Sequence, residues 1–308
     1  MTTFAVVVTS YNYRRFVEEA VDGALAQSRP PAQVIVVDDG STDGSPELLR
    51  ARYADDPRVV LACIANGGQL AAFAHGLDLV QADVACFLDA DDRWQPGYLQ
   101  AIGAVYDARG DIDAVFSDVT LFGDEQRTIA HARQPTELGH TAVATYALTT
   151  WYGAPTSALS LRTPLARRCL DLPADMATAW RLSADNCLVY GASLLGGRKQ
   201  FLPTGCVGYR IHGGNGWWSN RGPTQRYLNR LRSRALVAHY ARVAGLDDSC
   251  LELAKLEYLT KPRPDFAETR RYMSICLRSR ATPWKRAELA ASVFATWLGR
   301  HAGRRARR

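Results

Sequence analysis

The 308-residue sequence lacks the features that mark several large classes of protein. No window approaches the run of about 18 apolar residues that a membrane-spanning helix needs. The first residues, MTTFAVVVTSYNYRRF, lack a basic start, a long apolar core and a small-residue cleavage site. We therefore expect no signal peptide and a soluble or peripheral protein. There is no Walker motif, and no G-x-G-x-x-G follows the first apolar run, so P-loop and dinucleotide-binding proteins lose their main support.

Paired cysteines and C-terminal acidic residues are also scarce. The seven cysteines form no C-x-x-C pair, and several lie in apolar runs typical of buried free thiols, which favours a reduced, cytoplasmic chain.

Residues 221–308 carry 20 basic and 7 acidic side chains, whereas residues 1–220 carry 17 basic and 24 acidic side chains. The apolar and basic residues of 285–308 predict attachment to an anionic membrane, on the inner face of the cell membrane; a solvated helix is the alternative. Nucleic acid is not expected as a partner, because no binding motif accompanies the charge.

What the sequence does contain is a regular alternation of strand and helix patterns. Short β-branched apolar runs predict strands, and the segments between them have helical patterns. This alternation predicts a doubly wound α/β fold with a parallel sheet. Ser45 is expected to cap the second helix, with Pro46 at its first position. The predicted strands are 4–9, 33–37, 58–62, 83–88 and 112–116; the predicted helices are 14–27, 46–54, 69–80 and 97–108, then 225–243, 248–260, 265–279 and 284–299 beyond a looser stretch at 120–185.

Polar clusters follow the first four predicted strands: SYN at 10–12, DDGSTD at 38–43, NGGQ at 66–69 and DADD at 89–92. Ligands of such sheets bind beyond the carboxyl ends of the strands, so four loops should converge on one edge. Asp89 and Asp91 are two residues apart and point the same way if the chain stays extended, which suits Mg²⁺ or Mn²⁺. The alternative is a solvated turn in which Asp92 caps the next helix. Asp38 and Asp39 could accept hydrogen bonds from a base or a ribose, or could form a polar turn.

Taken in order, the motifs VVVTSYNY, VIVVDDGSTDGS, NGGQLAAFAHGL, FLDADDRWQPGYL and YRIHGGN resemble the family 2 glycosyltransferases with the GT-A fold. The resemblance is dense over residues 4–118 and thinner to about 216. It implies a Rossmann-like nucleotide-diphospho-sugar transferase domain at 1–222, in which 1–118 bind the nucleotide sugar and 119–222 form the acceptor side. Residues 223–308 would be a basic helical C-terminal region.

The resemblance also implies the ligands. The donor would be a nucleotide sugar, usually UDP-linked, with a divalent metal, Mn²⁺ or Mg²⁺, and the acceptor a saccharide or a lipid-linked molecule. Asp91 and His212 would bind the metal, although a lone His is as often structural. The implied donor-binding residues are Thr9, Tyr11, Asn12, Asp38, Asp39, Asn66, Gly67, Gln69, Asp89, Ala90 and Asp91.

The family keeps its general base in a Glu-Asp pair, and here RLSADNCLVYG has Ala184 in place of the Glu while Asp185 remains. We expect Asp185 to be the catalytic base; a helix cap is the alternative. Four aromatic residues could stack on the acceptor sugar or pack in the core. They are Trp151, Tyr152, Trp217 and Trp218.

The expected activity is inverting transfer of one sugar to an acceptor hydroxyl, in the biosynthesis of a cell-surface polysaccharide or glycoconjugate. No Q-x-x-R-W follows Asp185, so a processive synthase fits poorly. One alternative is a catalytically silent nucleotide-sugar-binding or scaffold protein, which the missing Glu motivates. A weaker one is a nucleotidyltransferase, whose glycine-rich basic loop is not seen. The oligomeric state stays open.

Overall fold

A mixed eight-stranded sheet forms the centre of the computed structural model, which describes residues 1–213 and 222–305. The strand order is β3-β2-β1-β4-β10-β6-β11-β9, and a second sheet has the order β5-β12-β7-β8. The strands are β1 Phe4–Ser10, β2 Gln33–Asp38, β3 Val59–Cys63, β4 Val84–Asp89, β5 Arg93–Trp94, β6 Ala114–Ser117, β7 Val119–Gly123, β8 Thr128–Ile129, β9 Thr136–Gly139, β10 Leu159–Arg162, β11 Lys199–Leu202 and β12 Val207–Ile211.

The predicted parallel sheet is confirmed for the first four strands and needs correction beyond them. β1 pairs in parallel with both β2 and β4, and β2 pairs in parallel with β3. Every residue of β1 is buried, as expected for a strand covered by helices on both faces. β10, however, runs antiparallel to β4 and to β6. The chain enters β10 from α5 and η1, beyond the regular alternation of strand and helix on which the prediction of a parallel sheet was based.

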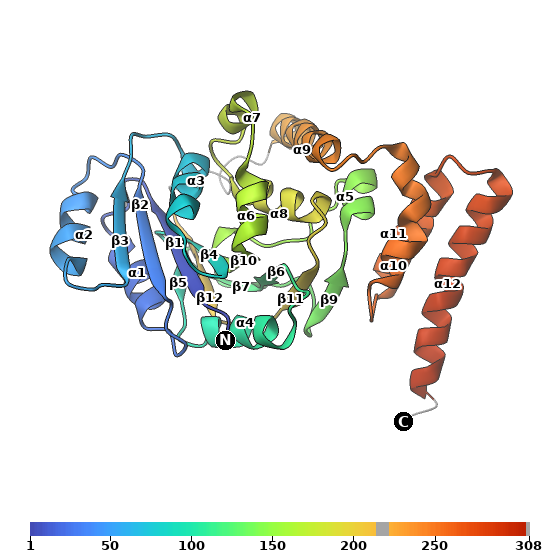
Figure 1. The fold of residues 1–308 in the computed structure, drawn as a ribbon, viewed down its shortest axis with the longest axis horizontal. Helices are drawn as coiled ribbons and strands as arrows, with labels where there is room; N and C mark the ends of the chain where they lie inside the picture. The colour runs from blue at the N-terminus through green and yellow to red at the C-terminus, as the bar shows by residue number, and fades with distance from the viewer. Residues whose placement is uncertain (214–221, 306–308) are drawn as a thin grey trace.

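Helices cover both faces of the sheet, with α3, α6 and α8 on one side and α4 on the other (Figure 1). The helices predicted in the first 118 residues are all present, although α2 begins at Ser45 itself. The expected cap is therefore wrong: the Ser45 hydroxyl donates to Asp43. The helices are α1 Val17–Leu25, α2 Ser45–Tyr53, α3 Gln69–Leu79, α4 Tyr98–Ala108, α5 Ala142–Leu148, α6 Thr163–Leu170, α7 Ala174–Ala179, α8 Asp185–Leu194, α9 Pro223–Val243, α10 Ala254–Leu259, α11 Phe266–Arg278 and α12 Pro283–Arg305, with 3₁₀ turns η1 Thr156–Ala158 and η2 Asp248–Leu253.

The helices α10, α11 and α12 lie at the end of the molecule opposite α2 (Figure 1). Buried charged groups join α10 and α11 to their neighbours. Glu257 accepts hydrogen bonds from the first backbone N–H groups of α5, Val143 at 2.7 Å and Ala144 at 3.0 Å. The Lys261 side chain is 1% exposed and lies 3.3 Å from the Glu268 carboxylate. The Glu257 bonds attach α10 to α5, and the Lys261–Glu268 ion pair joins the segment after α10 to α11. Within the described residues, no helix is long and apolar enough to cross a membrane.

Candidate active site

The loops that follow the first four strands meet at the carboxyl edge of the parallel sheet. The carbonyl of Thr9 accepts from the Ala90 N–H at 3.1 Å, and that of Ser10 accepts from the Asp39 N–H at 2.8 Å. These bonds join the end of β1 to the loops after β4 and β2. The structure therefore brings the predicted donor-binding segments together, as the strand order requires.

Asp39 holds the NGGQ loop in place. Its carboxylate accepts from the backbone N–H groups of Gly67 at 2.7 Å and Gly68 at 2.8 Å, and Asn66 donates to its carbonyl at 2.9 Å. Asp38 accepts from Ser41 through Oδ1, while its buried Oδ2 has no hydrogen-bond partner within the described residues. A buried acceptor without a partner is costly, so Asp38 Oδ2 is suited to a donor group of a ligand or to water.

Asn12 braces the first two loops against each other. Its backbone adopts a φ of 57°, its N–H donates to Ser41 Oγ at 2.8 Å, and its side-chain oxygen accepts from the Thr42 N–H at 2.8 Å. Neighbouring Tyr11 is exposed. Asn12 thus shapes the edge of the site, whereas Tyr11 is free to contact a ligand.

The three carboxylates of the DADD cluster have different surroundings. Asp89 Oδ1 accepts from Gln69 Nε2 at 2.8 Å, and Asp91 Oδ2 lies 3.0 Å from His212 Nε2. Asp92 accepts from the Ser157 hydroxyl at 2.6 Å and from the Arg210 N–H at 2.8 Å. Asp92 therefore ties η1 and β12 to β4, and it caps no helix.

Burial and mutual repulsion make protons hard to remove from this cluster. Burial, then the charges of Asp91 and Asp185, raise the pKa of Asp89 to about 8. Burial, followed by the charge of Asp91, raises the pKa of Asp92 well above its ordinary value. The pKa of Tyr13 is also raised, by burial and then by the charge of Asp91. A positive charge placed here would be stabilised by the carboxylates that repel one another without it.

The pairing of Asp91 with His212 is compatible with the expected divalent cation. Asp91 Oδ2 and His212 Nε2 lie 3.0 Å apart, at hydrogen-bonding distance, and a carboxylate oxygen and an imidazole nitrogen are both common metal ligands. Among residues 1–213 and 222–305, however, no group of three or more His, Cys, Asp or Glu side chains is arranged to hold a metal ion. The pair therefore suits a cation that takes its other ligands from water and from phosphate oxygens.

Asp185 begins α8, two residues after Ser183, whose φ is 64°. Its Oδ1 accepts from the N–H of Asn186 at 2.9 Å and from the Asn186 side chain at 3.1 Å, and no side-chain capping bond is made to α8. Burial raises the pKa of Asp185 to about 6. A carboxylate that is ionised at neutral pH, with a pKa close to it, has the chemistry of a general base.

The four aromatic residues predicted to contact an acceptor differ in their positions. Trp151 is 36% exposed. Tyr152 is only 1% exposed, and its hydroxyl donates to Glu268 at 2.7 Å. The cationic groups of Lys261 and Arg271 lie over its ring. This burial favours the core-packing alternative for Tyr152. Trp217 and Trp218 lie outside the described residues.

Two residues of η1 complete the site without having been predicted. The Ser157 hydroxyl accepts from the Asp89 N–H at 3.1 Å while donating to Asp92, and Thr156 Oγ1 lies 3.3 Å from Gln69 Nε2. In the sequence they stand in GAPTSAL, which contains no strand or helix signal strong enough to locate them. Their partners lie more than 60 residues away along the chain.

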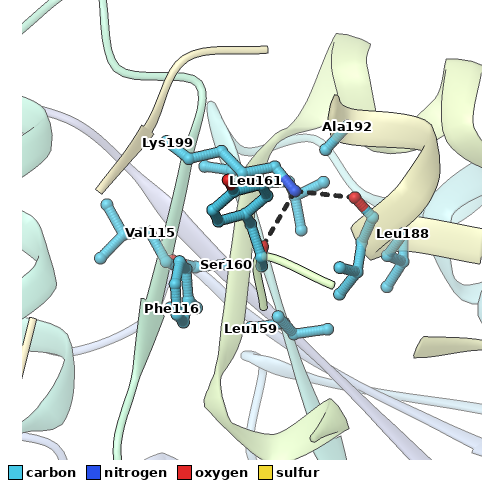
Figure 2. Close-up of a pocket in the computed structure, with 11 residues that line it drawn as sticks. Val115, Phe116, Leu159, Ser160, Leu161, Leu188, Ala192 and Lys199 are labelled. Carbon is cyan, nitrogen blue, oxygen red and sulfur yellow. Dashed lines mark hydrogen bonds between the residues drawn. The ribbon is translucent and has the colours of Figure 1, made fainter. Parts of the chain in front are cut away.

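A buried lysine, Lys199, lines the pocket that Figure 2 shows and was also not predicted. Lys199 is 2% exposed, and its ammonium donates to the carbonyls of Tyr152 at 3.0 Å and Val189 at 2.7 Å. Burial lowers the pKa of Lys199 to about 7. It therefore links the segment after α5 to α8, the helix that begins with Asp185.

Comparison with known proteins gives one family model and a set of relatives. The model described as glycosyl transferase family 2 matches residues 5–167. An uncharacterized glycosyltransferase of Nostoc, alr2836, is 33% identical over 215 residues, which is 68% of this chain and 65% of that protein. The putative teichuronic acid biosynthesis glycosyltransferase TuaG of Bacillus subtilis is 36% identical over 97 residues, 31% of this chain and 38% of that protein. The chain thus spans less than two thirds of each of these relatives.

Among solved structures, the fold is similar to that of Staphylococcus aureus TarS. The structure of TarS residues 1–349 with UDP-GlcNAc has a TM-score of 0.56 and 16% identity, covering 97% of this chain and 72% of that one. At this identity the likeness concerns the fold alone.

Proposed function

Because the chain belongs to glycosyl transferase family 2, we propose that it moves one sugar from a nucleotide-sugar donor to an acceptor hydroxyl. The observation that carries the proposal is the grouping of Asp89, Asp91 and Asp185 at the carboxyl edge of the sheet, where Gln69 bonds both Asp89 and the N–H of Ala184, the residue before Asp185. A UDP-linked donor is favoured because TarS has been solved with UDP-GlcNAc. The name of TuaG favours a cell-surface polysaccharide or glycoconjugate as the product.

The donor would lie across the loops after β1, β2 and β4. Asp38 Oδ2 is the free acceptor beside the Asp39-bound loop, so it suits the base or ribose. Thr9, Asn66 and Ala90 would line the nucleotide by packing against it, since the Thr9 carbonyl and Ala90 N–H bond each other and the Asn66 amide bonds Asp39. Exposed Tyr11 would lie against the nucleotide. Asp89 would face the ribose and diphosphate.

Asp91 and His212 are the residues that would hold the divalent metal, Mn²⁺ or Mg²⁺. When bound, such an ion stabilises the negative charge that develops on the leaving diphosphate. Asp92, which is fully engaged with Ser157 and Arg210, would keep the loop that carries Asp91 in position.

Asp185 would act as the base. Its carboxylate takes the proton of the acceptor hydroxyl while the acceptor oxygen bonds to the anomeric carbon and the bond from that carbon to the diphosphate oxygen breaks. Attack opposite the leaving group inverts the anomeric configuration. Since the chain lacks Q-x-x-R-W, we propose a single transfer for each encounter with the acceptor.

The acceptor would be a saccharide or a lipid-linked molecule near Trp151. Attachment to an anionic membrane through residues 285–308 stays part of the proposal, but α12 uses much of its apolar side internally. Val293 is buried, and Trp297 packs against Phe266 of α11 with ring centroids 5.3 Å apart, whereas Trp284 is exposed. Membrane contact would therefore depend mainly on charge.

Vesicle sedimentation tests the membrane part. The chain should sediment with phosphatidylglycerol vesicles and much less with phosphatidylcholine vesicles, and replacing Arg304, Arg305, Arg307 and Arg308 by Gln should reduce that binding. Equal partitioning of the variant and the natural chain would refute a role for the tail.

The activity is tested by screening nucleotide sugars for thermal stabilisation, with and without Mn²⁺, and then analysing the products. A bound donor raises the melting temperature by mass action. Release of a nucleoside diphosphate, lost in Asp91→Ala, would support glycosyl transfer, while pyrophosphate would indicate nucleotidyl transfer. Stabilisation with no turnover in any acceptor mixture would indicate the silent binding protein. Full activity of Asp91→Ala with metal chelated would refute the mechanism.

A further inference from the structure

We propose that Gln69 is a positioning residue that fixes Asp89 and the segment carrying Asp185 relative to each other, rather than a residue that binds the donor. The inference rests on the proposed function, because it assigns Asp89 to the donor side and Asp185 to the base. It also revises the role that the family resemblance implies for Gln69.

Three hydrogen bonds occupy the Gln69 side chain. Its Nε2 donates to Asp89 Oδ1 at 2.8 Å and to Thr156 Oγ1 at 3.3 Å. Its Oε1 accepts from the backbone N–H of Ala184 at 3.0 Å. A carboxamide has two N–H donors, and both are used here on the protein. The side chain therefore has no donor left for a nucleotide, although it lies within the loop that was expected to bind one.

The backbone of Gln69 is held on both sides, so the side chain starts from a fixed point. The preceding Gly68 adopts a φ of 87° and donates its N–H to Asp39 at 2.8 Å. The following Leu70 N–H donates to the carbonyl of Arg181 at 3.2 Å. The Arg181 side chain in turn donates to the Asn66 carbonyl at 3.1 Å. The start of α3 is thus pinned against the 181–184 segment.

Gln69 connects the strand that carries the donor-side carboxylate with the helix that carries the proposed base. Asp89 ends β4 and Asp185 begins α8, and the base must approach from the side opposite the leaving diphosphate. At the position where the family has a Glu, this chain has Ala184, whose side chain makes no hydrogen bond. Gln69 accepts from the Ala184 backbone N–H, so it holds the residue that directly precedes Asp185.

Two substitutions separate positioning from donor binding. Gln69→Met keeps the length of the side chain and removes all three bonds. Gln69→Glu keeps an acceptor for Ala184 but places a carboxylate beside Asp89. We expect kcat for transfer to fall roughly 10- to 100-fold in Gln69→Met, because a displacement of about 1 Å can cost that much, and further in Gln69→Glu. The Kd for UDP-GlcNAc should rise by a smaller factor than kcat falls in Gln69→Met, and the share of donor lost to water should rise.

Gln27 provides a matched control. It is a buried glutamine whose amide also makes three bonds, to the Gly23 and Gln95 carbonyls and from the Leu99 N–H, away from the site. Gln27→Met should lower the melting temperature and leave both kcat and the transfer-to-hydrolysis ratio unchanged.

Hydrogen exchange gives a readout that needs no turnover. In Gln69→Met the amide of Ala184 should exchange faster, because its acceptor is gone, while amides in β1 should not. Unchanged exchange at Ala184, or a tenfold loss of UDP-GlcNAc affinity with kcat retained, would overturn the proposal. Absence of turnover in the natural chain with every donor would instead count against the proposed function, and the exchange result would still decide the role of Gln69.

Discussion

Replacing Asp185 by Asn should abolish most of the activity while making the protein more stable. The substitution preserves the shape of the side chain, and its Oδ1 can still accept both bonds from Asn186. It removes the site at which the acceptor proton would be taken up. General bases contribute about 10²- to 10⁴-fold to rates, which is roughly 3–5 kcal/mol in the activation free energy.

The gain in stability follows from the pKa of Asp185, which burial raises from 3.8 to about 6. The folded chain then binds this proton more tightly than the unfolded chain, so the free energy of unfolding falls as the pH rises from about 4 to about 6. The full shift corresponds to about 3 kcal/mol at neutral pH as an upper bound. Asn carries no charge to desolvate, so the variant should be more stable at pH 7 and nearly equal to the natural chain at pH 4.

Both effects can be measured on one preparation. Release of nucleoside diphosphate at saturating donor, followed from pH 5 to 8, should rise through about pH 6 in the natural chain and stay low and flat in Asp185→Asn. Urea unfolding at pH 4 and pH 7 gives the stability difference. The assignment of Asp185 would be refuted if the variant kept its turnover within about threefold, or if both proteins had the same pH profile.

Three further predictions concern the surroundings of the site. Ala184→Glu, which would restore the acidic pair of the family, should destabilise the protein by on the order of 3–5 kcal/mol in urea unfolding, because Ala184 is fully buried and the new carboxylate would adjoin Asp185. A stable and faster enzyme would contradict this prediction. Tyr152→Phe should lower stability by roughly 1–2 kcal/mol through loss of the bond to Glu268 and leave transfer kinetics unchanged, whereas a selective rise in the acceptor KM would restore the acceptor role. Burial lowers the pKa of Lys199 to about 7, so from pH 7 to 9 the unfolded chain holds a proton that the folded chain has lost. The free energy of unfolding of the natural chain should therefore rise with pH by about 1 kcal/mol per pH unit relative to that of Lys199→Met. A difference between the two proteins that does not change with pH would show that Lys199 titrates normally.

Local patterns were enough to predict the first half of the fold. β1, β2 and β4 are continuous apolar runs because both of their faces are covered, and the Asp, Gly and Asn clusters after them mark loops whatever the rest of the chain does. The second sheet was missed because its strands are short and pair across long separations, as β5 does with β12, so neither strand has a strong pattern of its own.

The sequence by itself determined the α/β class, the order of the loops and the residue types at the carboxyl edge, since these depend on periodicity and on turn chemistry within short windows. Only the tertiary structure decided what each polar group contacts. Asp91 and Asp92 are adjacent in the chain, yet Asp92 accepts hydrogen bonds from Ser157 and Arg210 whereas Asp91 lies beside His212. Trp151 and Tyr152 are both aromatic, but only Tyr152 is buried, with its hydroxyl bonded to Glu268 of α11. Hydrogen bonds and burial depend on partners that are distant in sequence, and those become neighbours only when the chain is folded.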